Sequence, residues 1–177
     1  MRENLEAKWQ VSDLETVRAR AERAGASFQW RRAQRDVFFA VTQGRLKLRV
    51  TDEGKAELIA YFRPDEPGRQ ASRYIIARVD EPEALLSALS STVGVLAEVR
   101  KQRTLLLWRN VRVHLDEVEG LGTFVELESV VDADTPRDAA AANFEELASK
   151  LDLRPDKTVG KAYVDLVLAN DREGGRP

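Results

Sequence analysis

Residues Arg112–Glu128 read RVHLDEVEGLGTFVELE, two runs of alternating side chains joined by a turn that contains glycine. Alternation with a period of two predicts two β-strands paired as a hairpin. In the second strand, Glu126 and Glu128 point to the same face, about 7 Å apart along the strand. Two carboxylates this close repel each other unless a cation lies between them. A solvent-facing charged strand is the commoner explanation. The charge pattern of the other strands decides between this explanation and a cation-binding site.

The other predicted strands also carry charge on one face. The basic side chains on these faces are Lys8, Lys47, Arg49, Arg63, Lys101 and Arg103, and the acidic ones are Glu6, Asp116, Glu126 and Glu128. On a solvated surface they would form a salt-bridge lattice without a function. In a lumen, burying them without a ligand would be costly, whereas a polyphosphate with divalent cations satisfies both signs. Carboxylates without thiolate partners suit Mg²⁺ or Mn²⁺.

Composition excludes several classes of function. The chain has 177 residues, of which 43% are hydrophobic and 33% charged, as expected for one soluble domain with a real core. A net charge of −2 gives no broad attraction to nucleic acid or anionic membranes. The absence of cysteine excludes disulfides, thiolate nucleophiles and thiolate zinc sites. No apolar run approaches about 20 residues and no signal peptide is recognised, so we expect a cytoplasmic protein.

The order of predicted elements indicates a mostly antiparallel α+β fold, because most connections between strands are too short for crossovers. Besides the central hairpin, strands are expected over 4–11, 35–41, 45–50, 57–63, 72–79 and 95–108. Helices are expected after a capping box at Ser12–Glu15, after Asp80, after Thr135–Pro136 and over 159–168. We expect one domain over residues 1–169 and a disordered polar tail over 170–177.

An ordered set of motifs resembles the CYTH superfamily of triphosphate tunnel enzymes, in its class IV adenylyl cyclase-like branch. The motifs are Glu6-Ala7-Lys8, which matches most of an ExExK signature, then GRLKLR over 44–49, YFRPD over 61–65, VRKQR over 99–103, LDEVEGLG over 115–122 and FVELE over 124–128. Each motif alone is weak, but the ordered set covers nearly the whole chain. The resemblance implies a closed or nearly closed eight-stranded antiparallel tunnel with helices outside and a triphosphate along it.

The resemblance also implies roles for the charged residues. Glu6, Asp116, Glu126 and Glu128 fall at metal-binding positions, for Mg²⁺ or Mn²⁺. Lys8, Lys47, Arg49, Arg63, Lys101 and Arg103 fall at phosphate-binding positions, and Lys161 of a C-terminal helix closes over the phosphates. Of these, Lys8, Lys101 and Arg103 are assigned to catalysis.

The implied activity is conversion of ATP to cyclic AMP and pyrophosphate. The alternatives are a triphosphatase that hydrolyses inorganic or organic triphosphate, such as thiamine triphosphate, and a non-catalytic polyphosphate or nucleotide binder. The expected partner is a triphosphate-bearing small molecule rather than nucleic acid or membrane, and a homodimer is left open.

Asn4, His114 and the tryptophans need separate interpretation. Asn4 replaces the first glutamate of ExExK, and the neighbouring Glu3 should lie on the opposite strand face. His114, the single histidine, is a general base or nucleotide contact in one interpretation and a hydrogen-bonding partner of a carboxylate in the other, which we favour. The tryptophans, Trp9, Trp30 and Trp108, are expected to be packing residues rather than platforms for a nucleobase.

Overall fold

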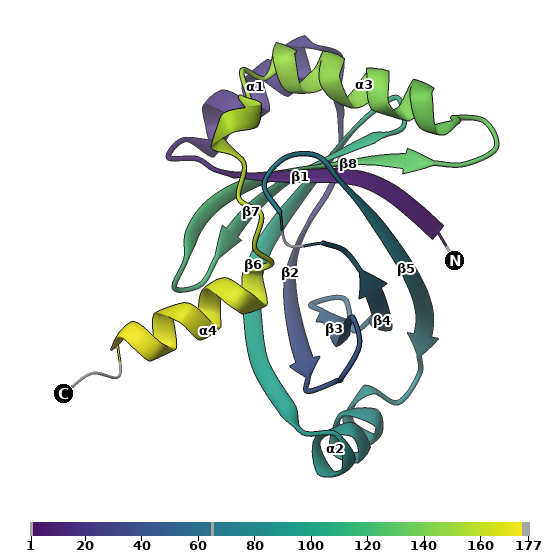
Figure 1. Cartoon of the computed structure of the whole chain (residues 1–177), viewed down its shortest axis with the longest axis vertical. Helices are drawn as coiled ribbons and strands as arrows, with labels where there is room; N and C mark the ends of the chain where they lie inside the picture. Colours follow the sequence, from purple (N-terminus) through teal and green to yellow (C-terminus); the bar gives the residue numbers. More distant parts are fainter. Residues whose placement is uncertain (1, 65, 175–177) are drawn as a thin grey trace.

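Eight strands form one closed barrel in the computed structural model, which describes residues 2–64 and 66–174 (Figure 1). Around the barrel the order is β1-β5-β4-β3-β2-β6-β7-β8, and each neighbouring pair is antiparallel. The strands are β1 (Arg2–Gln10), β2 (Ser27–Phe39), β3 (Arg45–Thr51), β4 (Ala56–Phe62), β5 (Gln70–Val79), β6 (Val95–Trp108), β7 (Val111–Val118) and β8 (Gly122–Val131). The expected α+β fold with an eight-stranded antiparallel tunnel is confirmed.

The central hairpin, β7 and β8, has the two faces that its alternation predicts. Val113 and Leu127 are fully buried in the outer core, whereas His114 and Glu126 line a cavity inside the barrel. The turn between the strands contains Gly120 with φ 73° and Gly122 with φ 96°. Side chains with a Cβ rarely adopt such angles, which is why glycine occurs here.

Three helices cover the outside of the barrel from two sides (Figure 1). Helices α1 (Leu14–Arg23) and α3 (Arg137–Lys150) pack on the outer faces of β1, β6, β7 and β8, in a core that contains Trp9 and Phe144. Helix α2 (Pro82–Thr92) packs through its leucines against the outer faces of β2 and β3. These helices bury the apolar outer faces of the strands that they cover, and the charged faces turn inward. None of the helices in the described residues is long and apolar enough to cross a membrane.

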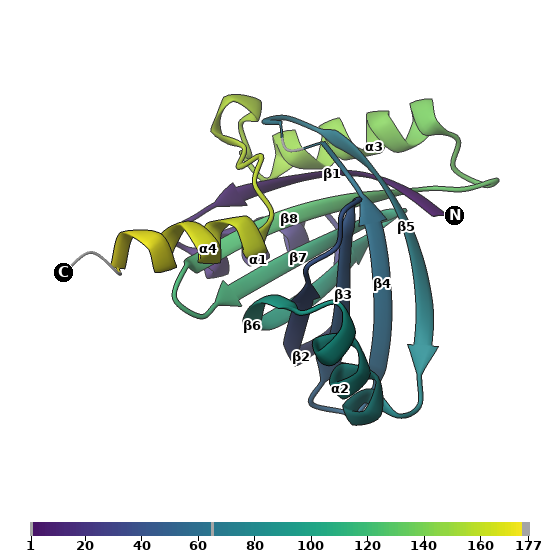
Figure 2. The same ribbon diagram turned by 60° about the horizontal axis from the view of Figure 1, so that its bottom comes forward.

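Helix α4 (Tyr163–Gly174) closes one end of the barrel. Figure 2 shows it beside the β7–β8 turn. Tyr163 and Val164, at its start, pack against Phe38, Val99 and Phe124 at this end of the barrel. Ala162 and Tyr163 also line the internal cavity. The tunnel is thus blocked where α4 begins.

The C-terminal prediction needs two corrections. The predicted helix over 159–168 begins only at Tyr163, because the preceding segment pairs with β1: the amide of Val159 donates to the carbonyl of Lys8 at 2.7 Å. The expected tail over 170–177 is helical to Gly174, and residues 175–177 lie outside the described residues. Asn170 explains part of this extension, since its amide donates to the carbonyl of Gly120 at 3.2 Å.

Strand β2 begins at Ser27 rather than near Arg35 as predicted, and it ends at Phe39 rather than Val41. Its first half is rich in Arg and Gln, so it lacks the apolar alternation that identifies strands in a sequence. It is a strand because it pairs along most of its length with β6, with a bulge between Phe28 and Trp30.

Three helix starts differ slightly from the predictions. Helix α1 is capped by Asp13, whose side chain accepts from the amide of Thr16 at 3.0 Å, rather than by Ser12. The N-cap of α2 is Glu81 rather than Asp80, and that of α3 is Pro136 rather than Thr135; neither makes a side-chain capping bond. Shifts of one residue at helix ends are common because end turns fray.

Candidate active site

The barrel encloses a cavity of about 400 Å³ that is lined by side chains from all eight strands and from the start of α4. Burial changes along its length. Asp36 and Lys8, deep inside, are almost completely buried, whereas Ile76 at the other end is 37% exposed. The cavity is therefore a tunnel with a closed end near Tyr163 and an open mouth.

Three glutamates form a cluster on one wall of the tunnel, which we call the acidic wall. One carboxylate oxygen each from Glu6, Glu126 and Glu128 lies within 4.8 Å of the others. The register between β1 and β8 brings them together, because Glu6 is directly opposite Glu128. Burial, together with repulsion from the other two carboxylates, raises the pKa of Glu6 to about 7, against the opposing effect of Arg63 and Lys8.

Cations surround the acidic wall without neutralising it fully. Nη1 of Arg63 donates to Oε1 of Glu6 at 3.0 Å, and Nη2 of Arg103 donates to Oε2 of Glu126 at 2.9 Å. Nε2 of His114 lies 3.1 Å from Oε2 of Glu128, which agrees with its expected place beside a carboxylate. Although burial opposes it, His114 and the nearby arginines hold the pKa of Glu128 well below its usual range.

The acidic wall fits a hard divalent cation. Its donors are carboxylate oxygens, the ligand type that Mg²⁺ and Mn²⁺ prefer, and the chain has no thiolate to compete. The buried polar atoms without a hydrogen-bond partner among the described residues include Nδ1 of His114 and Oε1 of Gln34, and both residues line the tunnel. Unpaired buried polar atoms are costly unless a ligand or water satisfies them.

The facing wall, formed by β2, β3 and β6, holds one carboxylate among three cations, and we call it the basic wall. Asp36 accepts hydrogen bonds from Nζ of Lys47 at 2.9 Å, Nε of Arg49 at 2.7 Å and Nζ of Lys101 at 3.0 Å. Burial would raise the pKa of Asp36, but the three cations hold it well below its usual range. Burial also lowers the pKa of Lys47 to about 7 and of Lys101 to about 8, with Asp36 working against both shifts.

Asp116 is not part of the acidic cluster, although the family resemblance places it at a metal-binding position. Arg103 binds both of its oxygens, at 2.6 Å each, and the hydroxyl of Tyr163 donates to Oδ2 at 2.7 Å. With these partners the pKa of Asp116 falls far below its usual range despite complete burial. In this structure Asp116 orients Arg103 and Tyr163.

Two predicted phosphate contacts lie in very different places. Lys8 is buried in the tunnel, with Nζ 3.9 Å from the centre of the Tyr163 ring, and its burial lowers its pKa. Lys161 is exposed in the segment before α4 and is not among the residues that line the tunnel. The structure thus brings together all the predicted phosphate-binding residues except Lys161.

Sequence reasoning gave no role to several residues that the structure places in the tunnel. Asp36 lies within the strand predicted over 35–41, and its alternation with Gln34 and Phe38 is a signal that could have placed it inside. No sequence signal identified Tyr163, because its role depends on where α4 meets the barrel. Trp9 and Trp108 are buried core residues as expected, but Trp30 lines the tunnel mouth.

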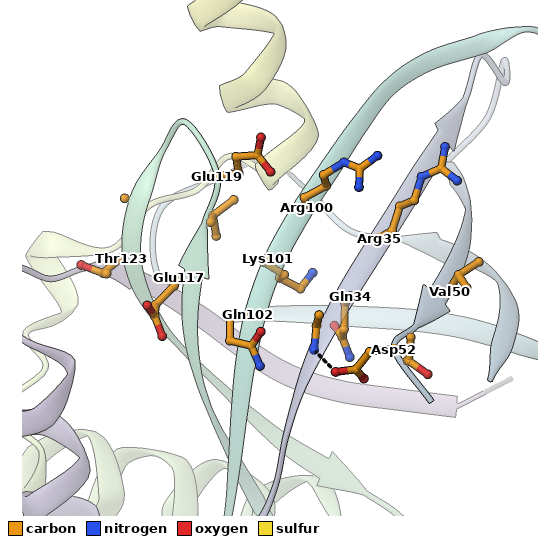
Figure 3. A pocket seen from close by; sticks show the side chains of 14 residues that line it. Gln34, Arg35, Val50, Asp52, Arg100, Lys101, Gln102, Glu117, Glu119 and Thr123 are labelled. Atoms are coloured by element: carbon orange, nitrogen blue, oxygen red, sulfur yellow. Dashed lines mark hydrogen bonds between the residues drawn. The ribbon is translucent and has the colours of Figure 1, made fainter. Parts of the chain in front are cut away.

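A second concavity of about 610 Å³ lies on the outside of the barrel, across β2, β6 and β7 (Figure 3). Arg35 and Arg100 lie directly opposite each other on neighbouring strands there. The two guanidinium groups share one carboxylate, because both contact Glu98, at 2.7 and 2.6 Å. Among the described residues, this outer surface lacks a cluster of three carboxylates like that of the tunnel, so the tunnel is the candidate active site.

Comparisons with known proteins agree with this geometry. A protein of Methanocaldococcus jannaschii named as a putative adenylate cyclase is 23% identical over 169 residues, which cover 92% of this chain and 97% of that protein. The structure of the PH1012 protein of Pyrococcus horikoshii has a TM-score of 0.81 at 24% identity, covering 92% of this chain and 98% of the other. A Hippeastrum protein described as a putative adenylyl cyclase with a dominant triphosphatase activity has a TM-score of 0.60 at 16% identity, covering 86% and 89%.

A model of a whole protein family also matches this chain. The family model of the CYTH domain matches residues 2–163, which include all eight strands and both walls of the tunnel. The chain therefore belongs to the CYTH domain family.

Proposed function

We propose that this protein is a divalent-metal-dependent enzyme that acts on a triphosphate in the tunnel, most simply by converting ATP to cyclic AMP and pyrophosphate. One observation carries the proposal: a single cavity has an unbalanced carboxylate cluster on one wall and a buried group of cations on the other. A triphosphate with a metal ion complements both walls at once, because it presents anionic oxygens and a cation together.

In the proposed reaction the ribose 3′-oxygen forms a bond to the α-phosphorus. The bond from that phosphorus to the bridging oxygen breaks, pyrophosphate leaves and the hydroxyl proton passes to solvent. Lys47, Arg49 and Lys101 bind the phosphate oxygens and stabilise the charge that develops on the leaving pyrophosphate. Glu6, Glu126 and Glu128 would hold the metal, which supplies Lewis acidity.

A triphosphatase is the second candidate: the oxygen of water forms a bond to the terminal phosphorus, the bond from that phosphorus to the bridging oxygen breaks, the diphosphate part leaves, and the attacked group becomes orthophosphate as a proton of the water passes to solvent. The same walls serve both reactions, since the two differ in where the phosphates lie relative to the carboxylates. The Hippeastrum structure supports this alternative through the triphosphatase activity that its description states for that protein. A non-catalytic binder is less favoured, because a binder that takes no metal has little use for three clustered glutamates.

Product analysis separates these functions. The purified protein is incubated with ATP, inorganic triphosphate and thiamine triphosphate, each with Mg²⁺ and with Mn²⁺, and the products are resolved chromatographically. Cyclic AMP with pyrophosphate supports the cyclase, and orthophosphate supports the triphosphatase. Binding without any product from the three substrates would leave only the binder.

A further inference from the structure

The open mouth of the tunnel differs chemically from its interior. Trp30, Leu105 and Ile76 line it, and none of the three is fully buried. These apolar side chains lie among charged residues such as Arg32, and they would be of no use to a bare polyphosphate, whose surface is anionic throughout. Such a lining is typical of sites for organic ligands, and a cavity of about 400 Å³ is within the range of such sites.

The bulge in β2 puts Trp30 in this position. Phe28 pairs with Leu106, which is buried in the outer core, whereas Trp30 pairs with Leu105, which lines the tunnel. On a regular strand, residues two apart share a face, so the bulge is what places Phe28 outside and Trp30 inside. Bulges that re-aim one side chain are common beside active sites.

Trp30 also has a partner suited to stacking. The guanidinium carbon of Arg32 lies 4.6 Å from the centre of the Trp30 ring, and Nε of Arg32 donates to Oε1 of Glu53 at 2.7 Å. Both Arg32 and Trp30 line the cavity. A planar guanidinium and an indole together form a surface on which an aromatic ring stacks favourably.

The spacing along β2 relates this surface to the basic wall. Trp30 precedes Asp36 by six residues of strand, which corresponds to about 20 Å. A chain of three phosphates bound near Asp36 is shorter than this and would leave the mouth empty, whereas a sugar and a ring attached to it extend toward Trp30.

We propose that the tunnel mouth, formed by Trp30, Arg32, Leu105 and Ile76, is a subsite for the aromatic group of an organic triphosphate, and that Trp30 makes the protein favour such substrates over inorganic triphosphate. This inference rests on the proposed function, since it takes the phosphates to lie on the basic wall. It names the substrate class as aryl-bearing triphosphates, with ATP as the probe.

The test compares ATP with inorganic triphosphate in four proteins: wild type, Trp30→Leu, Trp30→Phe and Phe28→Leu. Affinities are measured by calorimetry in metal-free buffer, to prevent turnover, and KM values with Mn²⁺. Trp30→Leu should lower the affinity for ATP by about 5- to 100-fold and leave the affinity for inorganic triphosphate unchanged, because only ATP has a ring to stack. Trp30→Phe should recover part of the loss. Phe28→Leu, on the outer face of the same strand, should change the affinity for neither ligand.

Tryptophan fluorescence gives a readout independent of turnover. ATP should quench wild-type emission and inorganic triphosphate should not, whereas Trp30→Leu should lose the quenching while Trp9 and Trp108 still emit. If Trp30→Leu lowers the affinity for both ligands equally, or does not lower the affinity for ATP, the proposed subsite is wrong. The proposal that the tunnel binds a triphosphate would still hold. If neither ligand binds to the wild type under either condition, the proposed function and the subsite both fail.

Discussion

On the acidic wall, three glutamates from β1 and β8 lie within 4.8 Å of one another, whereas on the basic wall one aspartate from β2 is surrounded by three cations. Both walls are buried and both contain ion pairs: Arg63 and Arg103 contact glutamates of the acidic wall, and Asp36 is the shared partner of the three cations of the basic wall. The acidic wall keeps a carboxyl group, Glu6, whose pKa is raised to about 7 by burial and by its acidic neighbours. The comparison teaches that the acidic wall calls for a cation, whereas the basic wall, with three cations around one carboxylate, calls for an anion.

The largest effect is expected when the acidic wall loses a ligand. Glu126→Gln should reduce turnover by more than about 100-fold, since even changes to the partners of metal ligands cost 10- to 100-fold. The fold should persist, because Arg103 keeps both bonds to Asp116. Steady-state rates over a range of Mn²⁺ measure the loss. Glu117→Gln, on the outside of the same hairpin, is the matched control, and wild-type rates in Glu126→Gln would refute the metal assignment.

A change on the basic wall should mainly lower the free energy of unfolding of the protein. Asp36→Asn leaves Lys47, Arg49 and Lys101 buried without their shared counterion, which should cost about 3–5 kcal/mol in the free energy of unfolding. Inorganic triphosphate should restore much of this stability by supplying the missing anion. Thermal unfolding with and without the ligand measures both effects. Asp156→Asn, at an exposed ion pair with Arg154, should change stability by less than about 0.5 kcal/mol. A variant as stable as the wild type would show that Asp36 is dispensable.

Two neighbouring cations of β6 should behave differently. Lys101→Ala removes a charged contact to phosphate worth about 1.5–3 kcal/mol, so triphosphate affinity should fall by about one to two decades while the metal requirement remains. Arg103→Ala should instead lower the melting temperature strongly, because Asp116 would be left buried without its cation. Calorimetry and thermal unfolding of both variants test the contrast. Unchanged triphosphate affinity in Lys101→Ala would show that Lys101 does not contact the phosphates.

The raised pKa of Glu6 predicts how metal binding depends on pH. Below about pH 7 the folded, metal-free protein keeps a proton on Glu6 that a metal must displace, so Mn²⁺ affinity should rise with pH, by up to about tenfold per unit between pH 6 and 7. The same proton makes metal-free stability fall as pH rises from 4.5 to about 7, because the unfolded chain has already released it. Mn²⁺ titrations measure the slope. Glu6→Gln should bind more weakly with a flatter profile, and a flat wild-type profile would contradict the prediction.

The smallest effect is expected at Asn4, which is buried on the acidic side and whose Oδ1 accepts a hydrogen bond from the hydroxyl of Tyr74 at 3.3 Å. Asn4→Glu adds a carboxylate to the strand that carries Glu6, so the Mg²⁺ concentration needed for turnover should fall severalfold. Rates against Mg²⁺ and Mn²⁺ concentration in both proteins provide the measurement. An unchanged metal dependence with weaker substrate binding would instead make Asn4 a contact on the phosphate side.

The alternation of charged and apolar residues was sufficient to predict which side chains share a strand face, whereas the resemblance to the CYTH superfamily was needed to predict that the charged faces line a tunnel. Glu126 and Glu128 could be placed on one face because a strand has a period of two, and the same rule placed Lys101 with Arg103. Glu3 also follows the rule: it pairs with Arg73 at 3.5 Å and with Arg137, away from the tunnel lining.

The remaining site features depend on tertiary geometry, which alternation does not specify. Asp116 is separated from the glutamates by its bonds to Arg103 and Tyr163, and the second of these comes from a distant helix. The position of Trp30 depends on an irregularity between two long strands. Lys161 was assigned to the wrong kind of element, because pairing of Val159 with β1 delays the start of α4.

The pairing of β1 with β8 has a consequence for the order of folding. Glu6 lies opposite Glu128, so the acidic wall is assembled from the two ends of the barrel sequence, and it forms only when the ring of strands closes. Such long-range pairing is the slowest kind of contact to form, because the intervening chain must first be brought together. On the ribosome, β1 must wait for β8 to be synthesised. Metal binding should therefore report on the last step of folding, and a metal-sensitive signal would time barrel closure.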